Sequence, residues 1–324
     1  MSKHPWRASF HGGHSWPFCD HAKGDLRDMI QAAAERGMQV YGVTEHAPRL
    51  GKQFLYPDER QWGWTVQTLE EKFAAYFETL NQLIEEFSSD IEVLRGFEIE
   101  VVPHSEWVSI MREYRERYDV EYIVGSVHYV DNISIDSFQE PFEHALDTFD
   151  GLERLAITYY ERVAEMVFNI EPEIVGHLDL IRKFGDRYGD VNTPAIRSAA
   201  RTALEEIRDR GGILDVNTSP YRKGASMPYP APWIVQEAHK MGIPFTFGDD
   251  SHDVSDVNAH LDDARRYLLE LGVDQVTHLR RSDDGSITRR IVSIAYTPEE
   301  QERIAWEQQR ATPTTSSSAS KDSK

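Results

Sequence analysis

Apolar residues along the chain alternate between short runs, typical of buried strands, and longer stretches with helical spacing. In the first helical stretch, Leu26, Met29, Ile30 and Ala33 recur at i, i+3, i+4 and i+7. This spacing places them on one face of a helix. Asp25 directly precedes that face, and aspartate is a favourable residue for capping a helix N-terminus. The pattern therefore predicts an amphipathic helix that begins after Asp25.

The same alternation continues to about residue 271. It predicts strands over residues 8–11, 38–43, 93–97, 122–127, 174–176, 213–216 and 244–247. It predicts helices over residues 25–36, 68–87, 105–118, 152–168, 194–210, 233–241 and 256–271, with Thr193 as the cap of the helix at 194–210. Strands that alternate with helices indicate a parallel sheet. Seven such units in one unbroken series favour an α/β barrel.

The last part of the chain has a different pattern. Two strand-like segments, 276–280 and 289–295, flank Asp283-Asp284-Gly285 and predict a terminal hairpin. Residues 311–324 are rich in serine and threonine and have few apolar side chains, so we expect them to be disordered. The predicted organisation is one barrel domain over residues 1–310 and a tail over 311–324.

Composition narrows the classes of partner. The chain has 324 residues, 40% of them apolar, and a net charge of −20 from 35 basic and 55 acidic residues. Such a surface repels nucleic-acid phosphates and anionic lipids. The sequence contains neither an apolar run long enough to span a bilayer nor a signal-peptide core. We expect a cytoplasmic protein without nucleic-acid or membrane partners. Cys19 is the single cysteine, so no internal disulfide forms, and we interpret it as a small buried residue rather than a reactive thiol.

Candidate chemistry is concentrated after the predicted strands. Seven of the 13 histidines lie there: His11, His14, His21, His46, His128, His177 and His252. Glu98 and Asp250 add carboxylates at the same kind of position. Strand ends converge on one face of a barrel, and imidazole and carboxylate groups suit Zn²⁺, Fe²⁺ and Mn²⁺. The number of ligands exceeds the need of one four-coordinate ion and predicts two or three divalent ions.

A single histidine after a strand is more often a hydrogen-bonded loop residue than a metal ligand. We assign the remaining histidines to that class: His4, His104, His144, His239, His260 and His278. What distinguishes the other seven is their joint pattern, in which histidine ends most of the predicted strands and a pair of glutamates, Glu98 and Glu100, ends another.

The order of these motifs resembles the PHP (polymerase and histidinol phosphatase) family. The segments that carry the resemblance are the histidines after the first strand, Phe18-Cys19-Asp20-His21-Ala22, Thr44-Glu45-His46-Ala47-Pro48, Gly96-Phe97-Glu98, His128, His177 and Asp250-Ser251-His252. Further segments are similar to the histidinol-phosphate phosphatases within it: Ser126-Val127-His128-Tyr129, the segment 176–183, Val216-Asn217-Thr218-Ser219 and Arg222-Lys223-Gly224. The resemblance covers residues 7–258.

This resemblance implies a distorted (β/α)₇ TIM-like barrel with a trinuclear metal site. It implies one ion at His11, His14, Glu98 and Asp250, a second at Glu98, His128 and His177, and a third at His21, His46 and His252. The family usually carries His-x-His after the first strand, whereas this chain has His11-Gly-Gly-His14. His11 therefore matches only if the two glycines form a bulge.

The resemblance also implies a reaction, the hydrolysis of a phosphomonoester and in particular of histidinol phosphate. Clustered cations lower the pKa of bound water towards roughly 7 and stabilise phosphate charge. We predict that Arg222, together with Lys183 or Arg182, binds the remaining phosphate oxygens, because guanidinium groups can pair with them twice. Asn217 is predicted either to orient the substrate or a ligand, or to hold the turn after its strand. The sequence does not select a general acid between Asp249 and Glu45.

Three alternatives remain open. A PHP phosphoesterase acting on a nucleotide or a sugar phosphate would keep all the ligands. A non-catalytic metal-binding module would be marked by lost ligands, whereas all nine positions are filled here. Another metal-dependent barrel hydrolase, such as an amidohydrolase, would lack the Gly-Phe-Glu and Ser-Val-His segments. The sequence predicts neither the metal among Zn, Mn and Fe nor the oligomeric state.

Overall fold

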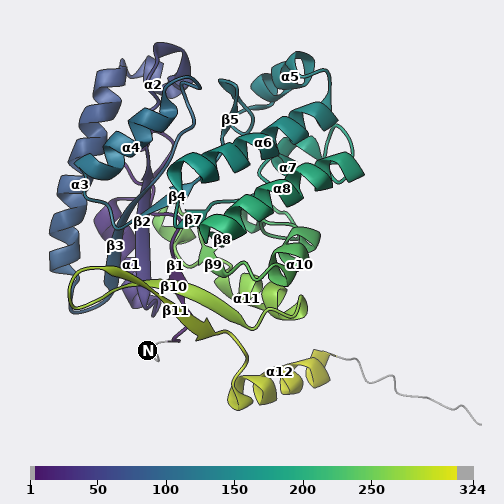
Figure 1. Cartoon of the computed structure of the whole chain (residues 1–324). Coiled ribbons are helices and arrows are strands. Elements are labelled where there is room, and N and C mark those ends of the chain that lie inside the picture. The colour runs from purple at the N-terminus through teal and green to yellow at the C-terminus, as the bar shows by residue number, and fades with distance from the viewer. Residues whose placement is uncertain (1–3, 312–324) are drawn as a thin grey trace, which may run out of the picture.

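Parallel strands occupy the centre of the molecule in the computed structural model, which describes residues 4–311 (Figure 1). The sheet has seven strands in the order β1-β2-β3-β4-β7-β8-β9. Their bounds are β1 (Ala8–Ser9), β2 (Val40–His46), β3 (Glu92–Glu98), β4 (Tyr122–Gly125), β7 (Ile174–Val175), β8 (Ile213–Asn217) and β9 (Phe245–Gly248). Every neighbouring pair in this sheet is parallel. All carboxyl ends of these strands therefore lie at one end of the sheet.

The first and last strands come close enough to bond to each other. The backbone N–H of Phe10 donates to the carbonyl of Phe247 at 2.9 Å. The N–H of Asp249 donates to the Ser9 hydroxyl, also at 2.9 Å. The sheet is therefore a nearly closed barrel, which confirms the predicted α/β barrel class.

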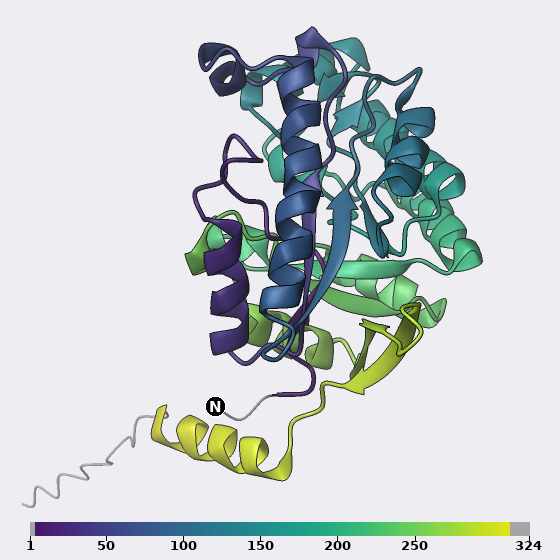
Figure 2. The same cartoon turned by 90° about the vertical axis from the view of Figure 1, so that its left-hand side faces the viewer.

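Seven helices correspond to those predicted from apolar spacing and cover the outside of the barrel (Figures 1 and 2). They are α1 (Leu26–Glu35), α3 (Val66–Glu86), α4 (Trp107–Arg117), α6 (Leu152–Ile170), α8 (Pro194–Arg210), α10 (Pro232–Lys240) and α11 (Leu261–Glu270). Asp25 and Thr193 cap α1 and α8 through their side chains, as predicted. The seven strand–helix units follow from the sequence pattern alone. No helix within residues 4–311 combines the length and apolar content needed to cross a membrane.

Most elements that the pattern did not predict lie in the loops that follow the barrel strands. These are α2 (Pro57–Gln61), the short hairpin of β5 (Tyr129–Val130) and β6 (Ile133–Ser134), α5 (Gln139–Thr148), α7 (Arg182–Gly185), α9 (Ser219–Arg222) and two 3₁₀ turns, Lys52–Phe54 and Val254–Asp256. They surround the carboxyl ends of the strands and build the walls of the site described below.

The barrel interior is apolar at its other end. Its core consists of Ala8, Phe10, Val40, Leu94, Tyr122, Val124, Ile174, Ile213 and Leu279. Leu279 belongs to β10 (Gln275–Arg281), which pairs antiparallel with β11 (Ile287–Ser293) and confirms the predicted hairpin. The hairpin lies across the amino-terminal end of the barrel (Figure 1). Arg281 joins it to that end by donating its backbone N–H to Glu92, the first residue of β3. The opposite end remains available for polar chemistry.

Most boundaries differ from the predictions by one to three residues, and the largest differences lie in the last part of the chain. The last barrel helix begins at Leu261 rather than at residue 256, because residues Val254–Asp256 form a 3₁₀ turn and His260 has a φ of 60°. An additional helix, α12 (Pro298–Ala311), follows the hairpin. The predicted disordered tail at 311–324 lies outside the described residues except for Ala311, so the boundary at residue 310 stays a prediction.

Candidate metal centre

The nine predicted metal ligands lie together at the carboxyl end of the barrel. They are His11, His14, His21, His46, Glu98, His128, His177, Asp250 and His252. Glu98, the last residue of β3, lies in the middle and is only 1% exposed. Its Oε1 is 3.0 Å from Nε2 of His11, and its Oε2 is 2.9 Å from Nδ1 of His46. The two carboxylate oxygens therefore face different histidines, as a carboxylate shared by two cations requires.

The two glycines after His11 lie beyond the end of β1 and adopt the unusual backbone that places this histidine. Gly12 and Gly13 have φ values of 145° and 79°, a backbone region that glycine enters without a steric penalty. The extra residue brings His11 and His14 to the same side. Both imidazoles are fully buried, and Nε2 of His14 lies 3.8 Å from Oε2 of Glu98. The structure thus places His11 inside the cluster.

A second group is formed by the histidines after β4 and β7. His128 Nε2 and His177 Nε2 are 3.3 Å apart, and both lie near Oε1 of Glu98, at 3.4 and 3.2 Å. His177 has a φ of 22° and Asp250 has a φ of 49°. Non-glycine residues in this region carry a strain on the order of 1–3 kcal/mol. Strained backbone at two candidate ligands is typical of a functional site.

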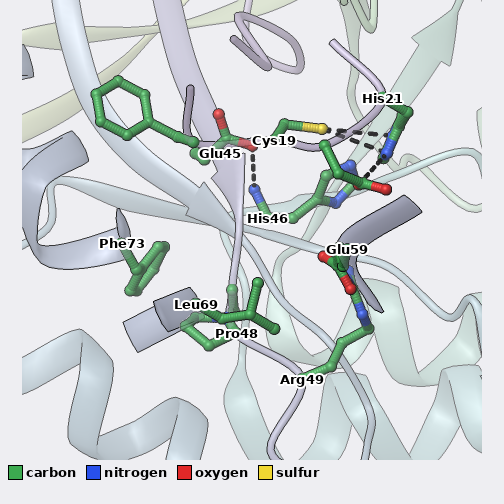
Figure 3. Close-up of a pocket in the computed structure, with 12 residues that line it drawn as sticks. Cys19, His21, Glu45, His46, Pro48, Arg49, Glu59, Leu69 and Phe73 are labelled. Atoms are coloured by element: carbon green, nitrogen blue, oxygen red, sulfur yellow. Dashed lines mark hydrogen bonds and ion pairs between the residues drawn. The ribbon is translucent and has the colours of Figure 1, made fainter. Parts of the chain in front are cut away.

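The third group lies at the rim, between the loop after β1 and the loop after β9. Nε2 of His21 and Nε2 of His252 are 3.1 Å apart. His46 is the third member, and the ring of His14 stacks on the rings of both His46 and His252 at 4.2 and 4.3 Å. Figure 3 shows His21 and His46 among the residues that line the neighbouring pocket. Some groups of donor atoms cross the three sets that the family resemblance implied, such as His46, Glu98 and His128. The assignment of ligands to individual ions therefore stays a prediction.

The chemistry of the donor atoms fits divalent cations. Buried ring nitrogens of His11, His14 and His46 and both oxygens of Glu98 have no hydrogen-bond partner, although buried polar groups almost always have one. Burial alone would raise the pKa of Glu98, but His11, His128 and His46 hold it well below its usual range. Glu98 is therefore an ionised carboxylate whose two oxygens face imidazole nitrogens, at 3.0 Å from His11 and 2.9 Å from His46.

Four further carboxylates lie behind the histidines and contact their other ring nitrogen. Asp215 is 2.8 Å from Nδ1 of His11, Glu45 is 3.5 Å from Nδ1 of His14, Glu100 is 3.3 Å from Nδ1 of His128, and Asp20 is 2.8 Å from Nδ1 of His21. Histidines that bind metals usually donate their second N–H to such a partner, which fixes the ring and leaves the first nitrogen for the metal. The same arrangement at four rings supports a metal centre.

Neither candidate general acid lines the larger pocket beside Glu98, His128 and His177, although Glu45 lines the smaller pocket beside Cys19, His21 and His46 (Figure 3). Glu45 accepts backbone N–H bonds from Ser15 and His46, both at 3.0 Å. Asp249 accepts backbone N–H bonds from Ser251 and Asn258, and burial raises its pKa to about 6. Both carboxylates hold loops in place, so their positions favour structural roles.

A pocket opens next to the cluster, and its other wall is basic. Lys183 from α7, Arg222 from α9 and Lys223 line it. Lys183 is 3.2 Å from Asp136. Arg222 donates to the backbone carbonyls of Asp249 and Asp250. The pocket therefore has cation ligands on one side and fixed positive charge on the other.

Arg182 and Asn217, which were also predicted as site residues, have side chains directed away from the pocket. Arg182 does not line the pocket: it pairs with Asp179 at 3.1 Å, donates to the carbonyl of Pro228 and covers the ring of Tyr229. Asn217 is fully buried, and its Nδ2 donates to Asp215 at 3.0 Å and to Asp250 at 3.3 Å. Its position favours orienting a ligand carboxylate over touching a substrate.

Several pocket residues were not selected from the sequence. Lys223 directly follows Arg222 in a segment that carried the family resemblance, so its position was a usable signal. Tyr56 comes from the long segment after β2 and Asp136 from the loop after β6. Nothing in the periodicity marks these two, because they lie outside the barrel strands.

The histidines and buried carboxylates at the strand ends place this chain in the class of α/β barrels with a candidate metal centre. Within that class, the chain belongs to the PHP domain family, whose model matches residues 12–219. It is 31% identical to the "Probable histidinol-phosphatase" of Schizosaccharomyces pombe, over 85% of this chain and 90% of that protein. It is 27% identical to the histidinol-phosphatase of Saccharomyces cerevisiae, over 84% of this chain and 91% of that protein.

A solved structure has the same fold. It is the histidinol phosphate phosphatase of Lactococcus lactis in complex with zinc, L-histidinol and phosphate. The TM-score is 0.63 at 17% identity, and the match covers 87% of this chain and 99% of that chain. The likeness extends over the barrel and its surrounding helices, so the architecture derived above is that of the family.

Proposed function

We propose that this protein is a histidinol-phosphatase that hydrolyses histidinol phosphate to histidinol and phosphate with the help of divalent metal ions. The observation that carries the proposal is the pocket in which the Glu98-centred ligand cluster faces Lys183, Arg222 and Lys223. A phosphate group placed there would meet positive charge on both sides. The relatives over most of the chain carry the name of the same activity.

We further propose that two or three ions bind, held by the three ligand groups around Glu98. When bound, the ions would supply Lewis acidity towards phosphate and a lowered pKa for water. Zinc in the related Lactococcus lactis structure and the mixed imidazole and carboxylate donors support Zn²⁺, Mn²⁺ or Fe²⁺. Asp215, Glu45 and Glu100 would keep the ligand rings in orientation.

The basic wall would bind the phosphate oxygens that face away from the ions. Arg222 is held by two backbone carbonyls and by Asp256 at 3.2 Å, so its guanidinium is fixed before a substrate arrives. Lys183 and Lys223 lie in the same wall, and burial together with the charge of Lys183 lowers the pKa of Lys223. An incoming phosphate would relieve the repulsion between these cations.

The remainder of the pocket suits an ammonium group and an imidazole ring. Asp136 and Glu100 offer carboxylates, while Tyr56 and Tyr229 offer aromatic surface. Although burial would raise the pKa of Asp136, Lys183 and His128 lower it to about 2, so this carboxylate is charged. A charged carboxylate favours the cationic histidinol over an uncharged sugar and disfavours the further phosphates of a nucleotide. We also propose that the protein acts in the cytoplasm on this small substrate alone.

The test is phosphate release from histidinol phosphate, nucleotides and sugar phosphates after loading with Zn²⁺, Mn²⁺ or Fe²⁺. We expect the highest kcat/KM for histidinol phosphate, and we expect Asp136→Asn to reduce that preference. His128→Ala and Asp250→Ala should lose turnover together with bound metal. Equal kcat/KM values across the panel would overturn the substrate assignment, and full turnover in either ligand variant would overturn the site.

A further inference from the structure

Cys19 is the only cysteine of the chain and lies in the loop between β1 and α1. We interpreted Cys19 from the sequence as a small buried residue rather than a reactive thiol, and it is only 5% exposed. Its side chain, however, points at the rim group of histidines (Figure 3). The sulfur lies 3.4 Å from Nδ1 and 3.5 Å from Nε2 of His21.

The sulfur completes a set of four donor atoms. One donor atom from each of Cys19, His21, His46 and His252 lies within 4.8 Å of every other. For Zn–S of about 2.3 Å and Zn–N of about 2.0–2.1 Å, a tetrahedral site has S···N edges of about 3.5 Å and N···N edges of about 3.4 Å. The observed separations are 3.5 Å from Cys19 Sγ to His21 Nε2 and 3.1 Å from His21 Nε2 to His252 Nε2. The sulfur is equally close to Nδ1 of His21, at 3.4 Å, so a change in the orientation of this exposed ring accompanies binding of a shared ion.

The surrounding contacts hold these donors in place and leave them unused. Asp20 takes Nδ1 of His21 at 2.8 Å, so Nε2 is the nitrogen left for a ligand. Nδ1 of His46 lies 2.9 Å from Oε2 of Glu98, so its buried Nε2 is the nitrogen without a partner. The backbone N–H of Cys19 donates to the carbonyl of Ser15 at 2.9 Å. The unpartnered Nε2 of His46, beside Nε2 of His21, points to a cation as the missing partner.

We propose that Cys19 is a protein ligand of the rim metal ion, which then has one thiolate and three imidazole ligands. This proposal rests on the proposed metal centre. Binding releases the thiol proton to solvent and adds one negative charge to a group of imidazole ligands. A thiolate is a soft donor that favours zinc or cobalt over manganese. The rim position should therefore select its ion more strictly than the two positions that share Glu98.

The experiment is a Co²⁺ titration of the metal-free full-length protein, followed by absorption spectroscopy. A thiolate bound to Co²⁺ gives a sulfur-to-metal charge-transfer band in the near ultraviolet, and in this chain only Cys19 can produce it. We expect the band to saturate with one of the bound equivalents. A protein that binds Co²⁺ without this band contradicts the proposal.

Cys19→Ser is the main variant because it keeps the size of the side chain, and Cys19→Ala is the second. Both should lose the band and weaken one metal equivalent by more than the roughly 10–100-fold typical of losing an outer hydrogen-bond partner. His252→Ala keeps the cysteine and should also lose the band, because it removes the shared ion. A band that survives in His252→Ala, or unchanged affinity for every equivalent in both Cys19 variants, overturns the proposal. Phosphate release, measured separately, tests the proposed function.

Discussion

Arg182 and Lys183 are neighbours in α7, yet their side chains lie in different surroundings. Lys183 lines the pocket beside the metal ligands. Arg182 turns away from it and pairs with Asp179, which is only 3% exposed. Lys183 thus faces the pocket in which we propose that the substrate binds, whereas Arg182 neutralises a buried carboxylate.

This difference leads to opposite expectations for a matched pair of variants. Lys183→Met should lower kcat/KM by roughly 10- to 100-fold, the value of a lost bond to a charged group of about 1.5–3 kcal/mol, while bound metal stays the same. Arg182→Met should leave KM nearly unchanged and lower stability by about 3 kcal/mol, because Asp179 loses its partner. Steady-state kinetics, metal analysis and thermal unfolding separate these effects. A stable Arg182→Met protein with a high KM would mean that Arg182 reaches the substrate.

At the residue scale, the sequence identified the candidate metal ligands more completely than the other residues that line the pocket. His128, His177 and Asp250 could be selected because each follows a strand, and strand ends meet by topology. Asp136 and Tyr56 could not, because they lie on irregular segments whose positions depend on tertiary packing. Arg182 and Lys183 could not be distinguished, since the direction of each side chain depends on partners distant in sequence.

At the scale of elements, the loop after β1 positions two ligands through its glycines. A Cβ added to Gly12 would overlap Oδ1 of Asp249 and lie 2.8 Å from the backbone nitrogen of Ser251. Both contacts belong to the loop after β9, which also carries Asp250. The close approach of these two loops is therefore what brings His11 near Asp250, at the point where the barrel closes.

Gly12→Ala should separate these loops. We expect it to reduce bound metal and to lower the free energy of unfolding by about 2 kcal/mol or more, since a strained backbone and an overlap with neighbouring backbone act together. Gly63→Ala is the matched control, because Gly63 also has a positive φ, of 73°, but an added Cβ meets nothing within 4 Å. Gly63→Ala should lower the free energy of unfolding by about 1 kcal/mol, and the protein should keep its bound metal. Equal metal content in both variants would show that the loop tolerates the change.

The helix α12 illustrates an element that the pattern did not predict. It attaches to α11 through Arg265, which contacts both carboxylate oxygens of Glu300 at 2.8 and 2.9 Å. The attachment of α12 depends on an ion pair between two helices, and the spacing of apolar residues in either helix does not predict that pair. The barrel helices, by contrast, show their buried faces directly in the sequence.

The same pair makes the attachment of α12 sensitive to acid. The hydrogen bonds from Arg265 lower the pKa of Glu300 to about 2, below its ordinary value of about 4.3. The contribution is therefore complete above about pH 4.3 and is lost as the pH falls from there towards 2. Glu300→Gln should remove roughly 1–2 kcal/mol at pH 7 and should lessen the change in stability between pH 5 and 3. Thermal unfolding of both proteins across this pH range measures the difference. If the stability of the two proteins changes with pH in parallel, the Arg265–Glu300 pair is not the source of the acid sensitivity.

At the scale of the whole molecule, the two ends of the barrel have separate tasks. The hairpin of β10 and β11 and the apolar core close the amino-terminal end. The carboxyl end carries the candidate ligands, which come from the last residues of β2 and β3 and from the loops after β1, β4, β7 and β9. The topology could be predicted because every strand–helix unit repeats one pattern. The degree of closure could not, because it depends on the contact between β1 and β9.

Ions bound at this end would connect strands that are far apart in sequence, so metal binding and folding should be coupled. A ligand that binds only the folded state adds about 2.7 kcal/mol when its concentration is 100 times its Kd. Chelation should therefore lower the Tm by several degrees, and added Zn²⁺ should raise it with the logarithm of its concentration. Glu98→Gln, which removes the carboxylate shared by two groups, should weaken that response most, whereas Lys183→Met should keep it. A Tm that is indifferent to chelation in the unaltered protein would mean that the cluster of histidines does not hold metal.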